Sequence, residues 1–425
     1  MDLIDQEKIV PLPTTAVLPF GDPSITPLEL KFTEARLDLR QQRFADRITL
    51  KPKLDLSDYR FEAVIDWIEF RVALKTPTQH RYLQDVLLGF LERKSMVTPV
   101  TPGPGDVSQV FDIKIHDPKS LAYVLDIYDA LVLKFGERTD PLVCGVEFSL
   151  DACPRVESEV ARRMLFGVLQ RTIFITRDIW TNRDSQPRSI ASSSDFDPEE
   201  LIDRKLLVAG KGENAEETYL APHNHRPAFI DGTMYLGDRD TDDVMIRIMD
   251  KIKDRQHTVK KTHLELSDSE KRVRIEVRIE GHELIDIGFF ELKQLDDFAF
   301  SKLQGRYFQF KLPTFRDVSG LKGSAGNAAI SLIERWRAET FLKTGVVGLD
   351  ASDRARAKRR QGMLPGFRAV LRSIGKTFTA TRAAAGLTRS FVAYEGLNLE
   401  AAGAFRRLGN REGTAWAKRA RRELS

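Results

Sequence analysis

The chain has 425 residues, of which 42% are hydrophobic and 30% charged, and its formal net charge is +4. This length suffices for two or three domains with well-packed cores, so the composition excludes an intrinsically disordered chain. There is no apolar run of membrane-spanning length, and we expect no secretory signal, because residues 1–15 have neither a basic flank nor an apolar stretch. With only Cys144 and Cys153, we expect a reducing, cytoplasmic location and no disulfide framework.

Charge is distributed unevenly along the chain. Residues 351–425 contain 17 Lys and Arg against 5 Asp and Glu, a net charge of +12, so residues 1–350 carry about −8 (49 basic against 57 acidic). A basic terminal segment on an acidic body favours a polyanionic partner, and nucleic acid is the first candidate.

In chain order, the first expected unit is an extended N-terminal arm over residues 1–58. It contains six prolines and no sustained hydrophobic period, apart from one short helix expected over 28–44.

From residue 59 to about 320 the pattern becomes that of an α+β domain. Alternating apolar residues predict strands, and apolar stripes behind N-capping residues predict helices. Expected strands are 63–74, 110–116, 143–151, 172–176, 233–237, 243–251, 272–281 and 306–312; expected helices are 78–94 with Thr78 as N-cap, 117–135 ended by Gly136, and 155–170. Residues 183–227 are polar and predict a loop or insertion, and 321–350 a connecting helix. The blocks 61–180 and 230–315 suggest pseudo-duplication of a strand–helix unit.

Several carboxylates fall within these expected strands. Alternation places Asp66 on the same face as Ile68 and Phe70, where a bare carboxylate requires an ion pair, a proton or a metal. Glu147 and Asp151 share the other face of their strand, which a solvated polar face would also explain. Asp250 follows Ile246 and Ile248 on one face of its strand, and Glu276 lies on the polar face of another, where an exposed charge ladder is the alternative explanation. Together these acids could hold Mg²⁺ or Mn²⁺.

The order of the strand motifs resembles that of the trans-acting rolling-circle replication initiators of plasmids and filamentous phages. The motifs are IDWIEFRV (65–72), FDIKIHDP (111–118), CGVEFSLDA (144–152), TMYLGDRDTDDVMIRIMDK (233–251) and RVRIEVRI (272–279). The resemblance covers about residues 60–315 and implies an antiparallel-sheet initiator domain. It also implies nicking of one DNA strand by a tyrosine, assisted by a divalent cation.

Carried over by motif, the resemblance implies metal ligation by Asp66, Glu147, Asp151, Asp250 and Glu276. It implies catalytic roles for Arg247 and Lys251 in the segment that resembles the family's "RIYDK". The tyrosine of that segment is Met249 here, and a thioether cannot form the phosphodiester link. Either the nucleophile lies elsewhere, with Tyr235 preferred over Tyr219, or the chain binds DNA without nicking it. Strand-end packing is the alternative explanation for Tyr235.

The C-terminal segment 351–425 is expected to be an all-α, basic DNA-binding module. Its pattern resembles a homeodomain-like helix-turn-helix, with a third helix over 389–395 stopped by Gly396. A helical bundle packed on the body is the alternative. The expected DNA-contacting residues are Arg354, Arg356, Lys358, Arg359, Arg360, Arg382, Thr388, Arg389, Ser390 and Tyr394.

Together these features predict a plasmid or phage replication initiator that binds an origin, as duplex and as single strand, and nicks it. A non-catalytic DNA-binding regulator on the same scaffold is the first alternative, and a conjugation or transposition nickase is the second. The expected cofactor is a divalent cation (Mg or Mn). No membrane partner is expected, and a homodimer is left open.

Overall fold

The computed structural model describes residues 10–18, 28–37, 44–91, 95–174, 189–192, 233–236, 243–257, 262–321, 327–328, 330–342, 345–346 and 391–424. Within these ranges, no helix is long and apolar enough to cross a membrane. The strands form a large sheet, a smaller sheet and a separate hairpin, and all their pairings are antiparallel. The predicted α+β class with antiparallel sheets is therefore confirmed, whereas pseudo-duplication stays a prediction.

The large sheet contains most of the strands expected from alternation. Its order is β5-β6-β4-β7-β14-β11-β10-β9. The strands are β4 (Tyr59–Gln79), β5 (Met96–Pro99), β6 (Val107–His116), β7 (Glu137–Pro154), β9 (Ser189–Ser192), β10 (Thr233–Leu236), β11 (Val244–Lys251) and β14 (Arg272–Glu280). The hairpin consists of β12 (Lys253–His257) and β13 (Thr262–Glu265).

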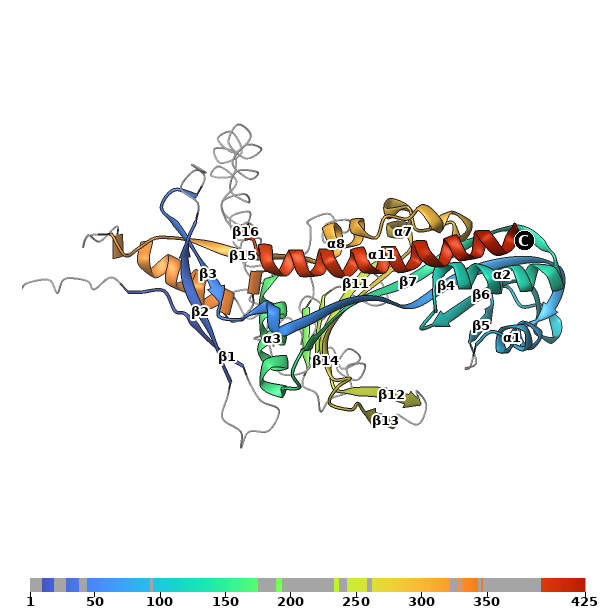
Figure 1. Ribbon diagram of the computed structural model, residues 1–425, viewed down its shortest axis with the longest axis horizontal. Coiled ribbons are helices and arrows are strands. Elements are labelled where there is room, and N and C mark those ends of the chain that lie inside the picture. Colours follow the sequence, from blue (N-terminus) through green and yellow to red (C-terminus); the bar gives the residue numbers. More distant parts are fainter. Residues whose placement is uncertain are drawn as a thin grey trace, which may run out of the picture.

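In the view of Figure 1, α7, α8 and α11 lie along the upper side of the large sheet, and the β12–β13 hairpin projects below it. The helices are α1 (His80–Leu88), α2 (Leu121–Phe135), α3 (Glu159–Thr172), α7 (His282–Ile287), α8 (Ser301–Tyr307) and α11 (Glu395–Glu423), with short 3₁₀ turns η2 (Leu56–Asp58), η3 (Pro104–Asp106) and η4 (Leu292–Asp297). Residues 330–342 are also helical.

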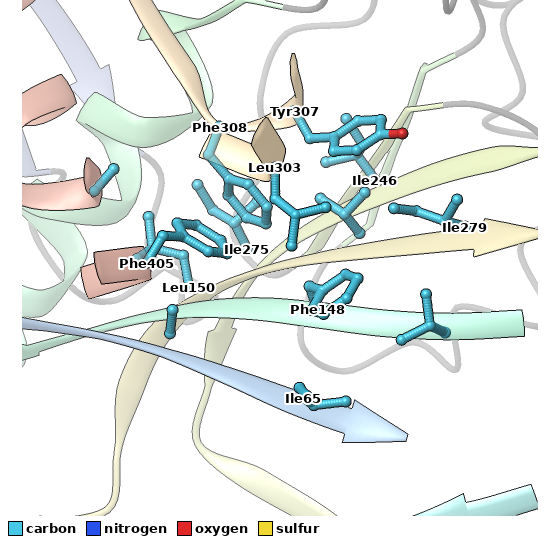
Figure 2. Close-up of a cluster of buried hydrophobic side chains, with 14 of the residues drawn as sticks. Ile65, Phe148, Leu150, Ile246, Ile275, Ile279, Leu303, Tyr307, Phe308 and Phe405 are labelled. Carbon is cyan, nitrogen blue, oxygen red and sulfur yellow. The ribbon is translucent and has the colours of Figure 1, made fainter. Parts of the chain in front are cut away.

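The core lies between the large sheet and these helices. Figure 2 shows Phe148, Ile246 and Ile275 on the strands directed toward Leu303 of α8 and Phe405 of α11. All five side chains are at most 1% exposed. Burial of such side chains contributes about 1.5–3 kcal/mol each relative to exposure, so this face of the sheet is fixed by packing.

The N-terminal residues form a sheet rather than an extended arm. The small sheet has the order β1-β2-β3-β15-β16, with β8 also paired to β15. Its strands are β1 (Thr15–Leu18), β2 (Leu28–Arg36), β3 (Arg47–Pro52), β8 (Ile173–Phe174), β15 (Gln309–Arg316) and β16 (Phe391–Ala393). The helix predicted over 28–44 is wrong, because Leu30 and Phe32 alternate with exposed residues and are buried at a period of two.

Serine side chains cap two of the predicted helices. The Ser120 hydroxyl accepts a hydrogen bond from Tyr123 N at 3.1 Å, and the Ser158 hydroxyl accepts one from Ala161 N at 3.1 Å. Both helices therefore begin later than predicted. Thr78 does not cap α1, since it is still part of β4. Gly136, with φ of 72°, ends α2 as predicted.

The described C-terminal residues belong to the body of the protein. Phe391–Ala393 pairs with β15 as β16, and α11 then packs along β4, α8 and α2 (Figure 1). The helix predicted over 389–395 is therefore wrong from 391 onward, and Gly396 lies inside the first turn of α11. The expectation of a separate all-α module over 351–425 is corrected accordingly: the part from 391 is a strand and a helix of the body, and residues 351–390 lie outside the described residues.

Candidate metal centre on the polar face of the large sheet

The second face of the large sheet is rich in charged residues. Ser149, Glu276 and Arg247 occupy directly opposed positions on β7, β14 and β11. Opposed residues of antiparallel strands project from the same face. Since Phe148 and Ile275 point into the helix-covered core, these three residues lie on the opposite, polar face.

A β-bulge brings Asp66 onto this polar face. Ile65 is paired with Phe148 and Trp67 with Glu147, so Asp66 is an extra residue between two pairs. An extra residue reverses the alternation beyond it. The prediction that Asp66 shares its face with Ile68 and Phe70 is therefore wrong. Its carboxylate instead accepts a hydrogen bond from the Ser149 hydroxyl.

Three carboxylates from three strands converge on the polar face. One oxygen each of Asp66, Glu147 and Glu276 lie within 4.8 Å of one another. Glu147 and Glu276 are only 9% and 3% exposed. The sequence predicted these three acids as ligands of one cation, and the fold brings them together although more than 200 residues separate the first from the last.

Arginine side chains hold two of the three carboxylates. Arg274 Nη1 lies 2.7 Å from Asp66 Oδ1, and Arg274 also forms two hydrogen bonds to Asp151, at 2.5 and 2.6 Å. Arg247 Nε donates to Glu276 Oε2 at 2.5 Å. No hydrogen bond or ion pair to the Glu147 carboxylate occurs among the described residues.

Burial and mutual repulsion raise the pKa values of two of these acids. The pKa of Asp66 rises to about 6, because burial outweighs the stabilising charge of Arg274, and Glu276 adds repulsion. The pKa of Glu147 rises to about 7, through burial first and then the charges of Glu276 and Asp66, against the opposing effect of Arg247. The cluster therefore has too little positive charge nearby to keep all its acids ionised.

The three acids fit a small divalent cation. Mg²⁺ and Mn²⁺ prefer carboxylate oxygens, and opposite ligands in an octahedral Mg²⁺ shell lie about 4.2 Å apart. Only one pair among three ligands can be opposite, and adjacent ligands lie about 3 Å apart. The three oxygens, which lie within 4.8 Å of one another, therefore have to move closer together when they bind one cation. A bound cation would also offset the burial and the mutual repulsion that raise the pKa values of Asp66 and Glu147.

Two further predicted ligands lie outside this triad. Asp151 is on the polar face, but Arg274 donates a hydrogen bond to each of its carboxylate oxygens, and Arg272 Nε lies 3.0 Å from one of them. Asp250 is opposed to Val273 and so lies on the other face, where its carboxylate is 2.5 Å from Arg162 Nε. The prediction of Asp250 as a ligand is therefore wrong, because the alternation that places Arg247 on the polar face turns Asp250 away from it.

The remaining candidates divide by location. Lys251 ends β11, opposed to Arg272, and Met249 is opposed to Arg274 on the polar face. Tyr235 lies on β10 in the position opposed to Arg247, in the same cross-strand row as Glu276. That register separates the Tyr235 and Glu276 backbones by about 10 Å, two strand spacings.

The predicted DNA contacts are mostly beyond the described part of the chain. Arg354, Arg356, Lys358, Arg359, Arg360, Arg382, Thr388, Arg389 and Ser390 lie outside the described residues. Tyr394 is described and is only 3% exposed, at the start of α11. The prediction that Tyr394 contacts DNA is corrected, because its side chain is part of the core.

Sequence reasoning missed three residues of the cluster as participants. They are Arg274, Ser149 and Lys114, and the charge of Lys114 acts on Glu147. All three sit at polar positions of alternating strands, and Arg274 lies two residues before Glu276. The two-residue spacing of Arg274 and Glu276 could have identified Arg274, because it places both side chains on one face of the strand and a buried acid requires a partner.

The fold and the site define an α+β protein whose large antiparallel sheet carries a buried carboxylate–arginine cluster. No protein-family model matches the chain, and no curated protein matches it. Among solved structures, the chain is similar to a rolling circle replication initiator protein from Geobacillus stearothermophilus, with 10% identity and a TM-score of 0.28 over 67% of this chain and 100% of that chain.

Proposed function

We propose that the protein is a replication initiator that binds DNA and nicks one strand with the help of a divalent cation. The observation that carries the proposal is the convergence of Asp66, Glu147 and Glu276 within 4.8 Å on one face of the large sheet. Three acids with a small separation, buried beside arginines, are suited to a cation that neutralises charge on a phosphate. The order of the strand motifs supports the DNA substrate.

In this proposal the three carboxylates hold Mg²⁺ or Mn²⁺, which when bound supplies positive charge at the scissile phosphate. Tyr235 is the nucleophile: its phenolic oxygen forms the bond to phosphorus, the bond to the 3′ oxygen breaks, and that oxygen ends as a hydroxyl. The 5′ phosphate stays linked to the protein and conserves the bond for resealing. Arg247, opposed to Tyr235 on the next strand, orients Glu276 through their ion pair.

The direct test uses supercoiled plasmid that carries the DNA flanking the protein's own gene, incubated with the full chain and Mn²⁺. We expect open-circular product and a protein-linked 5′ end. Tyr235→Phe should abolish both and leave binding unchanged, whereas Tyr82→Phe, at an exposed tyrosine of α1, should have no effect. Nicking that survives Tyr235→Phe would assign the nucleophile to another residue.

Metal binding has its own test, independent of nicking. Titration with Mn²⁺, followed by electron paramagnetic resonance, should show a site that Glu147→Gln abolishes. Glu62→Gln is the matched control, because Glu62 lies on β4 near Asp66 but is exposed. Equal Mn²⁺ affinity of the wild type and Glu147→Gln would reject the metal centre.

The second candidate function is a DNA-binding regulator without nicking activity. The ion pairs of Arg274 with Asp66 and of Arg247 with Glu276 favour it, because they already satisfy two of the three acids, and Met249 stands at the family's tyrosine position. A successful gel shift without any open-circular product would favour this candidate. The conjugation or transposition nickase shares the chemistry of the first proposal and differs from it in the DNA site.

A further inference from the structure

Three cations act on the Asp66 and Glu147 carboxylates, and they differ in how they are bound. Arg274 and Arg247 are held in the ion pairs described above. Lys114 of β6 is the third, and it acts on Glu147 through its charge. Within the described part of the chain, its ammonium forms no hydrogen bond or ion pair, and its close contact is the ring of Trp67, 3.1 Å from Nζ to the centroid.

The sheet register places Lys114 and Trp67 beside the three acids. Lys114 alternates with the buried Ile113 and Ile115, so it lies on the polar face. Trp67 is opposed to Glu147 across the β4–β7 pair. Both residues therefore share the face of the triad.

A glycine makes room for the Trp67 ring. A Cβ on Gly145 would lie 3.0 Å from Trp67 Cζ3, so the ring rests on bare backbone there. Gly145 precedes Glu147 by two residues, about 7 Å along the strand. The ring thus contacts the Lys114 ammonium on the polar face. Lys114 lies in the cross-strand row of Glu69 and Gly145, which is the row beyond Glu147.

This ammonium is half-buried and forms no ion pair within the described part of the chain, although Glu69 is opposed to Lys114 across the β4–β6 pair. Burial lowers the pKa of Lys114, although the charges of Glu69, Glu147 and Glu280 act in the opposite direction. A half-buried cation that is not engaged in an ion pair gains more from an added anion than one already paired. Lysine acts as a point charge toward phosphate, without the geometric demands of arginine.

We propose that Lys114 binds a phosphate of the nucleic acid strand next to the scissile one, and that Trp67 is the residue that positions its ammonium. The inference rests on the proposed function, because it assigns one contact of the same substrate. It goes beyond that function in naming a phosphate subsite on β6, outside the acid triad.

The test measures binding of the full chain to a labelled single-stranded oligonucleotide from its own flanking DNA, at a series of salt concentrations without divalent metal. Each bound phosphate contributes about 0.7 to the slope of log Kobs against log salt for single strands. Lys114→Gln should reduce the magnitude of this negative slope by about that amount, and Lys114→Arg should restore the magnitude. An unchanged slope for Lys114→Gln overturns the inference.

Lys311 provides the matched control. It is half-buried, its Nζ lies 3.4 Å from the centroid of the Phe174 ring, and burial lowers its pKa as well. It belongs to β15 of the small sheet, away from the triad. Lys311→Gln should therefore keep the wild-type slope, and an equal decrease of the slope in both variants overturns the inference.

Mn²⁺ binding distinguishes the removal of a phosphate-binding group from damage to the fold. Removing the Lys114 charge takes a positive charge away from Glu147, so Lys114→Gln should bind Mn²⁺ as tightly as the wild type or more tightly while it binds DNA more weakly. A variant that binds both Mn²⁺ and DNA more weakly has a damaged site, which overturns the phosphate assignment.

Loss of the Trp67 ring should affect DNA binding differently from loss of the Lys114 charge. Trp67→Leu keeps the lysine charge and so should keep the salt slope, but it should weaken DNA binding because the ammonium is no longer held in place. Trp67→Phe should restore the affinity, since an aromatic ring is retained, and failure of this rescue overturns the positioning role.

A wild-type chain that neither binds nor nicks DNA rejects the proposed function itself, whereas nicking by the wild type together with an unchanged salt slope for Lys114→Gln rejects the phosphate subsite alone.

Discussion

At the scale of single residues, the raised pKa values of Asp66 and Glu147 have a consequence for stability. Their pKa values, about 6 and about 7, exceed the ordinary 3.8 and 4.5 of free carboxylates. The folded state therefore holds protons that the unfolded chain releases. The stabilisation is complete below about pH 4 and is lost as the pH rises through 6 and 7.

We therefore expect the free energy of unfolding without divalent metal to fall by roughly 5 kcal/mol between pH 4.5 and pH 7.5, as far as these two acids determine it. Glu147→Gln should flatten this dependence and stabilise the protein at pH 8. Urea denaturation across the pH range measures both effects. Glu62→Gln should leave the profile unchanged, and a wild-type stability that rises over this range because of Glu147 would contradict the assignment.

Arg274 is the residue on which the cluster depends most for stability. It is 6% exposed and its guanidinium bridges Asp66 and Asp151. Its removal takes the buried guanidinium away from both carboxylates and leaves Asp66 with Ser149 and Asp151 with Arg272. Arg274→Ala should therefore lower the free energy of unfolding at pH 7 by about 3 kcal/mol. Chemical denaturation measures the decrease.

Arg71→Ala is the matched control for Arg274. Arg71 also forms a two-pronged pair, with Asp112 at 2.7 and 2.8 Å, but its side chain is 45% exposed. Solvent screens such a pair, so we expect a decrease of at most about 1 kcal/mol. Similar decreases in the two variants would show that burial does not determine the strength of the Arg274 network.

At the scale of elements, polar contacts join α11 to α2 at two places. The Glu412 side chain, 3% exposed, accepts a hydrogen bond from Leu121 N at 2.8 Å, at the start of α2. At the far end of α11, Arg419 pairs with Asp126 and Asp129 of α2. Two helices from distant parts of the chain are thus joined by polar contacts as well as by packing.

We expect Glu412→Ala to lower the free energy of unfolding by about 1–2 kcal/mol, because it leaves a backbone N–H at the start of α2 without its acceptor. Thermal or urea unfolding measures it. Glu400→Ala is the control: Glu400 lies on the same helix and has no hydrogen bond or ion pair within the described ranges. Equal decreases would indicate a general effect on α11 rather than the removal of a cap.

At the scale of the whole molecule, the basic charge of the C-terminal region divides into two parts. Arg419 and Arg422 of α11 are paired with acids of α2. The segment 351–390 contains ten Lys and Arg against one Asp. It is therefore the better candidate for binding duplex DNA, and the DNA-contacting residues predicted there stay a prediction.

Replacing Arg354, Arg356, Arg359 and Arg360 together by Gln should weaken duplex binding. The magnitude of the negative slope of log Kobs against log salt should decrease by up to about 0.9 for each phosphate that the variant no longer binds. Arg419→Gln should reduce stability without changing the slope, because its guanidinium is engaged with Asp126. An unchanged slope in the fourfold variant would remove the basic segment from the DNA interface.

The sequence by itself determined the α+β class, most strands of the large sheet and the identity of three clustered acids. Alternation at a period of two is a local property, so VFDIKIH and RVRIEVRIE reveal their strands directly. Only the tertiary structure decided which face Asp66 occupies, because a one-residue bulge against β7 has no signature within the strand itself. The tertiary structure also decided the partner of Asp250, which is Arg162 of α3. It decided the burial of Tyr394 and α11 as well, because that burial depends on packing against residues hundreds of positions earlier. Burial and partner choice are set by distant parts of the chain, and local pattern does not contain them.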